Sequence, residues 1–182
     1  VQALWYNALK IVAELAEQYG DNPSQFNDMA ELAKISFNAV FWNKDELCLF
    51  DVVENGDRDG SIPPNQILAV SLPHSMLALD RAQQVVNKVE TELLTPVGLR
   101  SLSPDDPAYV PRYSGSPFER DSAYHQGTVW GWLIGPFIDA YAKAYPERVE
   151  IVESLTAGFR KHLLEAGVGQ VSEIFDAEPP FA

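Results

Sequence analysis

The chain has 182 residues, of which 26 are Asp or Glu and 13 are Lys or Arg, so its formal net charge is −13. A chain of this length can bury a sizeable core as one domain, and we treat residues 1–182 as a single unit. The acidic balance argues against nucleic acid or a membrane surface as the partner, because both demand clustered Lys and Arg. A neutral ligand fits better.

Cys48 is the only cysteine, and it lies in the apolar run LCLF, which indicates a buried, inert thiol. A single cysteine excludes an intrachain disulfide and is typical of a reducing compartment, so we expect a cytoplasmic protein. No apolar stretch approaches the ~20 residues that a membrane helix needs, and no signal peptide is visible. Because the chain starts at Val1 inside an amphipathic pattern, we expect it to be part of a longer polypeptide.

Two helices are predicted at the start of the chain. Apolar residues recur at helical spacing from Val1 to Tyr19, and Gly20 follows where a helix would end. Asn22 as N-cap, a proline after it and a glutamine at the capping-box position open a second helix that runs to Val40. The short turn between them predicts a helical hairpin. The segment LCLF that follows is a short β-like run before acidic turns.

Four more helices are expected in the rest of the chain. Residues 62–71, with prolines at 63 and 64, form a proline-delimited entry into a third helix, and Asp80 with the glutamine three residues later caps the fourth. A fifth helix starts near Gln126 with a kink at Pro136, and a sixth opens at Pro146. Six helices, almost no strand and no repeat predict an all-α fold of stacked hairpins. The long connections should gather at one end, which would be the working face.

The segment 98–132 is the longest connection and the richest in functional side chains. Loops longer than about 12–15 residues are usually functional or disordered, and disordered loops are poor in aromatics. This segment contains Arg100, Arg112, Arg120, Tyr109, Tyr113, Tyr124, His125, Trp130 and Trp132. Aromatic faces, Arg side chains and carboxylates together suit a neutral polyol such as a sugar. The alternative is a loop that Tyr and Trp merely pin onto its own domain.

Glu173 and Asp121 are the carboxylates of greatest interest. Glu173 lies after a Gly-x-Gly break between Val171 and Ile174, and a carboxylate in apolar surroundings has a raised pKa or is paired. It could equally be an ordinary carboxylate at a helix start. Asp121 precedes His125 just before a predicted helix; it could be a cap or loop pin, and the histidine a hydrogen-bonded wall residue.

A third acidic group contains Asp51, Asp57, Asp59 and Asn65. It resembles a calcium loop superficially but lacks the spacing of one. No H-E-x-x-H or Cys/His spacing is present, so we expect no metal site and no cofactor. Nucleophile elbows, Walker loops and dinucleotide glycine motifs are also missing from the sequence.

Five ordered motifs carry a family resemblance. They are QALWYNAL at 2–9, PNQ at 64–66, GLRSL at 98–102, DSAYHQGTVW at 121–130 and SEIFD at 172–176. Together they resemble the C-terminal glucosidase domain of glycogen debranching enzymes, the amylo-α-1,6-glucosidases. That resemblance implies roughly the second half of an (α/α)₆ barrel of the six-hairpin glycosidase type. The preceding part of the barrel would then lie upstream of Val1.

The resemblance also implies an inverting α-glucosidase that acts on α-1,6-linked glucose in glycogen or a related α-glucan. Glu173 matches the position of the general base, with Asp121 as the second catalytic candidate. The family's general acid lies in a W-M-D-A type motif that would fall before Val1, so this chain alone should be inactive. The implied substrate-binding residues are Arg100, Tyr124, His125, Trp130, Asp51 and Asn65.

Three positions depart from the family pattern, and two other functions remain open. Pro63 stands where the family tends to have Arg, Gly131 replaces a usual Pro, and Ala177 replaces a usual Gly. The first departure removes one expected sugar contact. The alternatives are another carbohydrate-active enzyme on the same barrel, such as a different glycosidase, a phosphorylase or an epimerase, and a non-catalytic helical interaction module.

Overall fold

The computed structural model describes residues 1–148, 150–165 and 169–181. Within these ranges lie seven α-helices: α1 (Gln2–Gln18), α2 (Ser24–Val40), α3 (Leu68–Ser71), α4 (Leu79–Leu93), α5 (Pro117–Ala123), α6 (Ile134–Ala144) and α7 (Ile151–Glu165). Two 3₁₀ turns, η1 (Pro64–Ile67) and η2 (Gly131–Leu133), lead directly into α3 and α6. None of the described helices is long and apolar enough to cross a membrane.

Helices α1 and α2 form the predicted hairpin. Gly20 has φ +82°, and the amide of Asp21 donates to the carbonyl of Ala16, as at a glycine-terminated helix end. The start of α2 differs by one position from the prediction, because its N-cap is Pro23 and no side chain caps it. The carboxamide of Asn22 instead accepts a hydrogen bond from the amide of Ser24 at 2.9 Å.

The main core lies where α4 packs against α6. Val85, Val86 and Val89 of α4 are fully buried, and they face the equally buried Phe137 and Ala140 of α6. Helix α4 begins at Leu79 after Ala78, so the predicted cap at Asp80 is wrong. Asp80 lies in the first turn, where its charge still interacts favourably with the helix dipole. The glutamine at position 83 donates instead to the last carbonyl of α6, that of residue 144.

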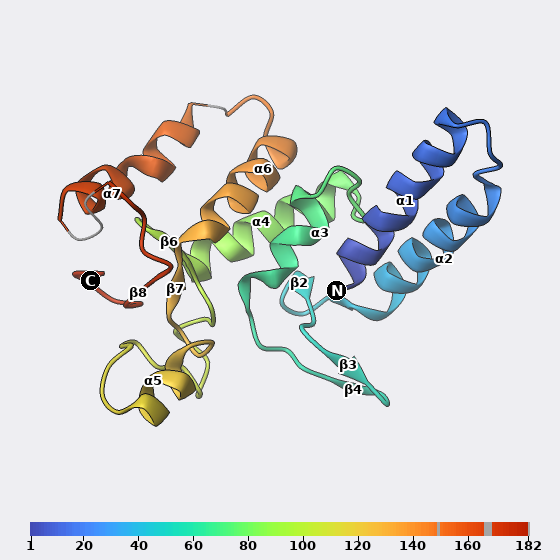
Figure 1. Cartoon of the computed structure of the whole chain (residues 1–182). Coiled ribbons are helices and arrows are strands. Elements are labelled where there is room, and N and C mark those ends of the chain that lie inside the picture. The colour runs from blue at the N-terminus through green and yellow to red at the C-terminus, as the bar shows by residue number, and fades with distance from the viewer. Residues whose placement is uncertain (149, 166–168, 182) are drawn as a thin grey trace.

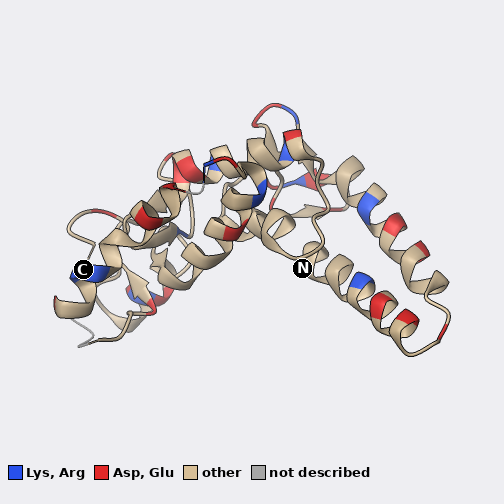
Figure 2. Cartoon of the chain, turned by 90° about the horizontal axis from the view of Figure 1, so that it is seen from above, with Lys and Arg blue, Asp and Glu red and all other residues tan. Residues whose placement is uncertain are grey.

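The connections fall at two ends of the helices, as expected. The α1–α2 and α3–α4 turns and the C-terminal end of α6 are all on the upper side in Figure 1, whereas the long segments 41–67 and 98–130 extend from the lower side. Seen from above, the helices follow a curve from α7 through α6 and α4 to the α1–α2 hairpin (Figure 2). The concentration of long connections at one end is therefore confirmed.

Apart from the β-like run at 47–50, the short strands are a feature that the sequence analysis missed. The described ranges contain two two-stranded sheets, β1 (Trp42–Asn43) with β2 (Cys48–Leu49) and β3 (Val53–Glu54) with β4 (Asp57–Arg58), and one four-stranded sheet. The strand order in the four-stranded sheet is β5 (Leu94–Thr95), β6 (Gly98–Arg100), β7 (Val129–Trp130) and β8 (Ile174–Phe175), and all neighbouring strands are antiparallel. Each described strand has only two or three residues, so the expectation of a helical fold with almost no strand is confirmed. The predicted β-like run at 47–50 contains β2.

Both late helix starts are also corrected. The fifth predicted helix does not begin near Gln126, because Val129 and Trp130 are extended in β7 and α6 begins at Ile134. An additional short helix, α5, precedes β7. Pro136 lies in the first turn of α6, where a missing amide costs little, so it need not kink the helix. The last helix begins at Ile151, not at Pro146.

Candidate active site

The segment 98–132 is an ordered platform held by its own backbone. The amide of Ser101 donates to the carbonyl of Thr128 at 3.0 Å, and the amide of Val110 donates to that of Gln126. Helix α5 has a reciprocal capping box between Ser116 and Glu119, whose backbone and side-chain hydrogen bonds lower the pKa of the Glu119 carboxyl. These contacts give the segment 98–132 an ordered backbone.

Gly98 allows the two strands of this segment to approach. A β-carbon at this position would lie 2.8 Å from the carbonyl carbon of Trp130 and 2.9 Å from the α-carbon of Gly131. Its φ of +139° is also unfavourable for any other residue. Position 98 therefore requires glycine, because here β6 passes close to the backbone of Trp130, one of the predicted sugar-binding residues.

Strand β8 brings Glu173 beside Trp130. Trp130 pairs with Ile174 and Val129 pairs with Phe175, and the amide of Gly131 donates to the carbonyl of Glu173 at 3.3 Å. Glu173 is exposed, so the apolar surroundings that its sequence neighbours suggested are not found. The reason is visible next to it, since Val171 is itself 49% exposed.

Three rings form a compact aromatic cluster next to Glu173. The His125 ring stacks on the Trp130 ring with centroids 5.3 Å apart and planes 3° apart, and Tyr124 meets Trp130 edge-on at 4.7 Å. The indole N–H of Trp130 donates to the carbonyl of Tyr124 at 3.2 Å, which fixes the orientation of the ring. Burial, followed by the nearby negative charge of Glu173, raises the pKa of the Tyr124 phenol.

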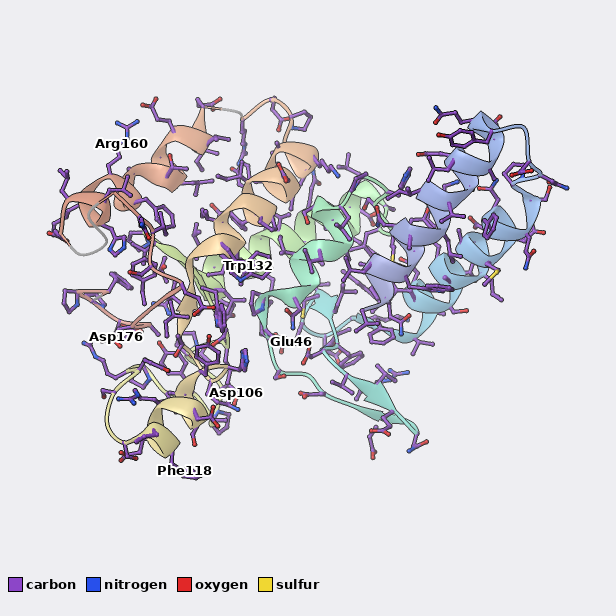
Figure 3. The ribbon with its side chains drawn as sticks, in the orientation of Figure 1. Glu46, Asp106, Phe118, Trp132, Arg160 and Asp176 are labelled. Carbon is purple, nitrogen blue, oxygen red and sulfur yellow. The ribbon has the colours of Figure 1, made fainter. Side chains whose placement is uncertain are left out.

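A hollow of about 260 Å³ opens beside this cluster. Its lining consists of Asp51, Pro63, Pro64, Asn65, Ser101, His125, Trp130, Trp132 and Leu133. Figure 3 shows Trp132 at the centre of the molecule, between the start of α6 and the segment that leads to η1. Four predicted substrate-binding residues, Asp51, Asn65, His125 and Trp130, thus come together from three separate parts of the sequence.

Asp51 lies at the boundary between this hollow and a larger one. A second hollow of about 570 Å³ shares Asp51, Pro63 and Asn65 with the first and extends along the start of α1. Asp51 is exposed as a residue, but neighbouring atoms remove its carboxyl partly from water. This burial, followed by the nearby negative charge of Asp59, raises the pKa of the Asp51 carboxyl.

Arg100 and Asp121 lie elsewhere. The Nε of Arg100 donates to the carbonyl of Ala177 at 3.1 Å, and its Nη2 approaches the carboxylate of Glu178 at 3.4 Å. Arg100 therefore contacts the C-terminal segment and is not among the residues that line the 260 Å³ hollow. Asp121 is an exposed residue inside α5, not a helix cap, since the N-cap of α5 is Ser116.

The acidic group at 51–59 is a hairpin. Asn55 and Gly56 both have positive φ, 51° and 96°, as in the tight turn that an Asn-Gly pair favours, and they join β3 to β4. Among the residues that the structure describes, no group of three His, Cys, Asp or Glu side chains could hold a metal ion. The sequence analysis also missed Ser101 and Leu133 as lining residues, because neither residue type signals a sugar site.

A family model described as amylo-alpha-1,6-glucosidase matches residues 1–182, the whole chain. The chain belongs to the amylo-alpha-1,6-glucosidase family. A glycogen debranching enzyme of Saccharomyces cerevisiae is similar, with 28% identity over 145 residues. That match covers 75% of this chain but only 9% of the yeast protein.

Solved structures share the fold at low sequence identity. A GH63 mannosylglycerate hydrolase from Thermus thermophilus has a TM-score of 0.72 and 16% identity, covering 98% of this chain and 39% of that one. A neutral trehalase from Saccharomyces cerevisiae has a TM-score of 0.75 and 14% identity, covering 97% and 33%. These neighbours are (α/α)₆-barrel glycosidases, so the all-α, barrel-type fold is confirmed. The chain spans well under half of their length.

Proposed function

We propose that this amylo-alpha-1,6-glucosidase family chain supplies the general base and one wall of the sugar site of an inverting glycoside hydrolase. The substrate in this proposal is α-1,6-linked glucose at the branch points of glycogen or a related α-glucan. The observation that carries it is the pairing of β7 with β8. Trp130 pairs with Ile174, the residue after Glu173, and Trp130 lines the hollow together with Asp51, Asn65 and His125, which supports a role for Glu173 beside this hollow.

Each part of this site has a chemical task in the proposed reaction. The flat faces of His125 and Trp130 suit the CH-rich face of a glucose ring, and Asp51 and Asn65 suit its hydroxyl groups. The Glu173 carboxylate takes a proton from a water molecule, which attacks C1 on the side opposite the leaving oxygen. The Tyr124 ring, which packs edge-on against Trp130, forms another side of this cluster.

The reaction needs a second carboxyl group ~6.5–9.5 Å from the first to protonate the leaving oxygen. In the family pattern this acid lies in a motif that residues 1–182 do not contain, which leaves Asp121 as the secondary candidate within them. The rest of the barrel would bring the acid and cover apolar side chains that now face solvent. Leu4 and Trp5 of α1 are 53% and 49% exposed, and Leu32 of α2 is 66% exposed.

The decisive experiment follows glucose release from limit dextrin by the natural polypeptide that contains residues 1–182. An inverting enzyme releases β-glucose first, which proton NMR detects before mutarotation. Glu173→Gln keeps the shape of the side chain but removes the base, so turnover should fall about 10²- to 10⁴-fold while substrate still binds. Glu153→Gln, on an exposed carboxylate of α7, is the matched control and should leave turnover unchanged.

Two results would overturn the proposal. Near-normal turnover by the Glu173→Gln enzyme would remove the base assignment, and release of α-glucose would remove the inverting mechanism. Residues 1–182 expressed alone should neither release glucose nor remain monodisperse. Clear glucose release by that segment would move the acid to Asp121. A cytoplasmic location stays a prediction from the single cysteine.

A further inference from the structure

Glu173 itself makes few fixed contacts, so its position depends on what holds the segment around it. On its N-terminal side, the amide of Ser172 donates to Nε2 of His162 at 3.1 Å. Its own carbonyl accepts from Gly131. On its C-terminal side, residues 176–179 run along the loop 109–113, and this second contact is the more extensive one.

Arg112 is the centre of that contact. Its Nη1 lies 2.9 Å from Oδ2 of Asp176 and 3.2 Å from the carbonyl of Glu178, and its Nη2 lies 2.6 Å from the carbonyl of Pro179. One planar guanidinium thus binds three residues of the C-terminal segment. Figure 3 shows Asp176 beside the loop that carries α5.

Asp176 completes the junction from the other side. Its Oδ1 accepts a hydrogen bond from the amide of Tyr113 at 2.8 Å, and the amide of the next residue, Ala177, donates to the carbonyl of Pro111 at 2.9 Å. Phe175 and Ala177 are 2% and 0% exposed, so the backbone on both sides of Asp176 is held by packing. Only two residues separate this junction from Glu173.

We propose that Arg112 and Asp176 are positioning residues for Glu173: their ion pair fixes β8 against the 109–113 loop and so sets where the carboxylate stands relative to the sugar hollow. The inference rests on the proposed function of Glu173 as the base. Arg112 is 43% exposed and Asp176 19%. A pair this open to water contributes little to overall stability, whereas a displacement of about 1 Å at a catalytic group can cost about 100-fold in rate.

The test uses the natural polypeptide that contains this chain, assayed on limit dextrin. Arg112→Ala should lower kcat on the order of 10- to 100-fold, with KM and the thermal unfolding midpoint nearly unchanged. Asp176→Asn keeps an acceptor for the Tyr113 amide but loses the charge, so it should lower kcat less. Arg160→Ala, which removes an exposed Arg that pairs with Glu153 within α7, is the control and should leave kcat unchanged.

A double substitution separates positioning from a general loss of structure. Residues that act as a unit are not additive in their effects, so adding Arg112→Ala to Glu173→Gln should not lower the residual turnover further. A loss that multiplies with that of Glu173→Gln, or a KM that rises while kcat holds, would overturn the proposal. If Arg112→Ala does not fold, the same comparisons with Asp176→Asn decide.

The controls distinguish failure of this inference from failure of the proposed function. No glucose release by the unaltered enzyme, or full turnover by Glu173→Gln, removes the proposed function and this inference with it. If both of those results are as proposed and Arg112→Ala and Asp176→Asn retain full kcat, the positioning role alone is wrong.

Discussion

Replacing Gly98 with Ala tests whether the approach of β6 to β7 holds the site together. The new β-carbon would stand 2.8 Å from the carbonyl carbon of Trp130 and 2.9 Å from the α-carbon of Gly131, both of which are backbone atoms. Neither can rotate away as a side chain could. An unfavourable φ costs about 1–3 kcal/mol, and an overpacked contact costs about 1–3 kcal/mol more. We therefore expect a loss of about 2–6 kcal/mol in the free energy of unfolding.

Two other glycines provide matched controls for that figure. Gly20 has φ +82° with no atom within 4 Å of an added β-carbon, so Gly20→Ala isolates the backbone strain, about 1 kcal/mol. Gly60 has open space and no positive φ, so Gly60→Ala should be neutral or stabilising by about 0.4–1 kcal/mol. Urea unfolding followed by circular dichroism gives all three values. A Gly98→Ala protein as stable as Gly60→Ala would refute the reasoning.

Two further outcomes follow from the site and the core. Trp130→Ala, made in the Glu173→Gln background so that substrate is not consumed, should weaken oligosaccharide binding about tenfold by calorimetry, equivalent to about 1.4 kcal/mol. Unchanged affinity with a lowered unfolding midpoint would mean that the Trp130 ring serves packing only. Cys48 is 1% exposed, and burial raises the pKa of its thiol to about 11. Its alkylation at pH 8, followed by mass spectrometry of its peptide, should be at least about 100-fold slower than in urea-unfolded protein, and rapid labelling of the native protein would contradict that.

The helices that the sequence predicted well are those whose apolar spacing and end signals are local. Helix α4 is an example, because Val85, Val86 and Val89 repeat at helical spacing and all become buried against α6. The errors lie where tertiary contacts override local preference. Val129 and Trp130 look like the start of a helix, but pairing with β6 and β8 holds them extended and delays α6 to Ile134.

The candidate site divides in the same way. The aromatic and acidic residue types that suit a sugar were identifiable, and Asp51, Asn65, His125 and Trp130 do line one hollow. The direction of a long flexible side chain could not be predicted. Arg100 belongs to a predicted motif, yet its guanidinium contacts the carbonyl of Ala177 and the carboxylate of Glu178, on the C-terminal segment. Which carboxylates and carbonyls surround an Arg depends on segments far away in the sequence.

The four-stranded sheet is the hardest feature to predict and the most consequential for the site. Periodicity needs about four to eight residues to identify a strand, and β7 and β8 contribute only two each. The pairing of Trp130 with Ile174 nevertheless brings the backbone of Glu173 beside Trp130, although more than forty residues of chain separate them. A strand of two residues has little stability of its own, so its position must come from its neighbours. For β8 those neighbours are β7 on one side and the Arg112–Asp176 ion pair just beyond its end. The position of Glu173 therefore depends on the assembled fold and not on the SEIFD motif alone.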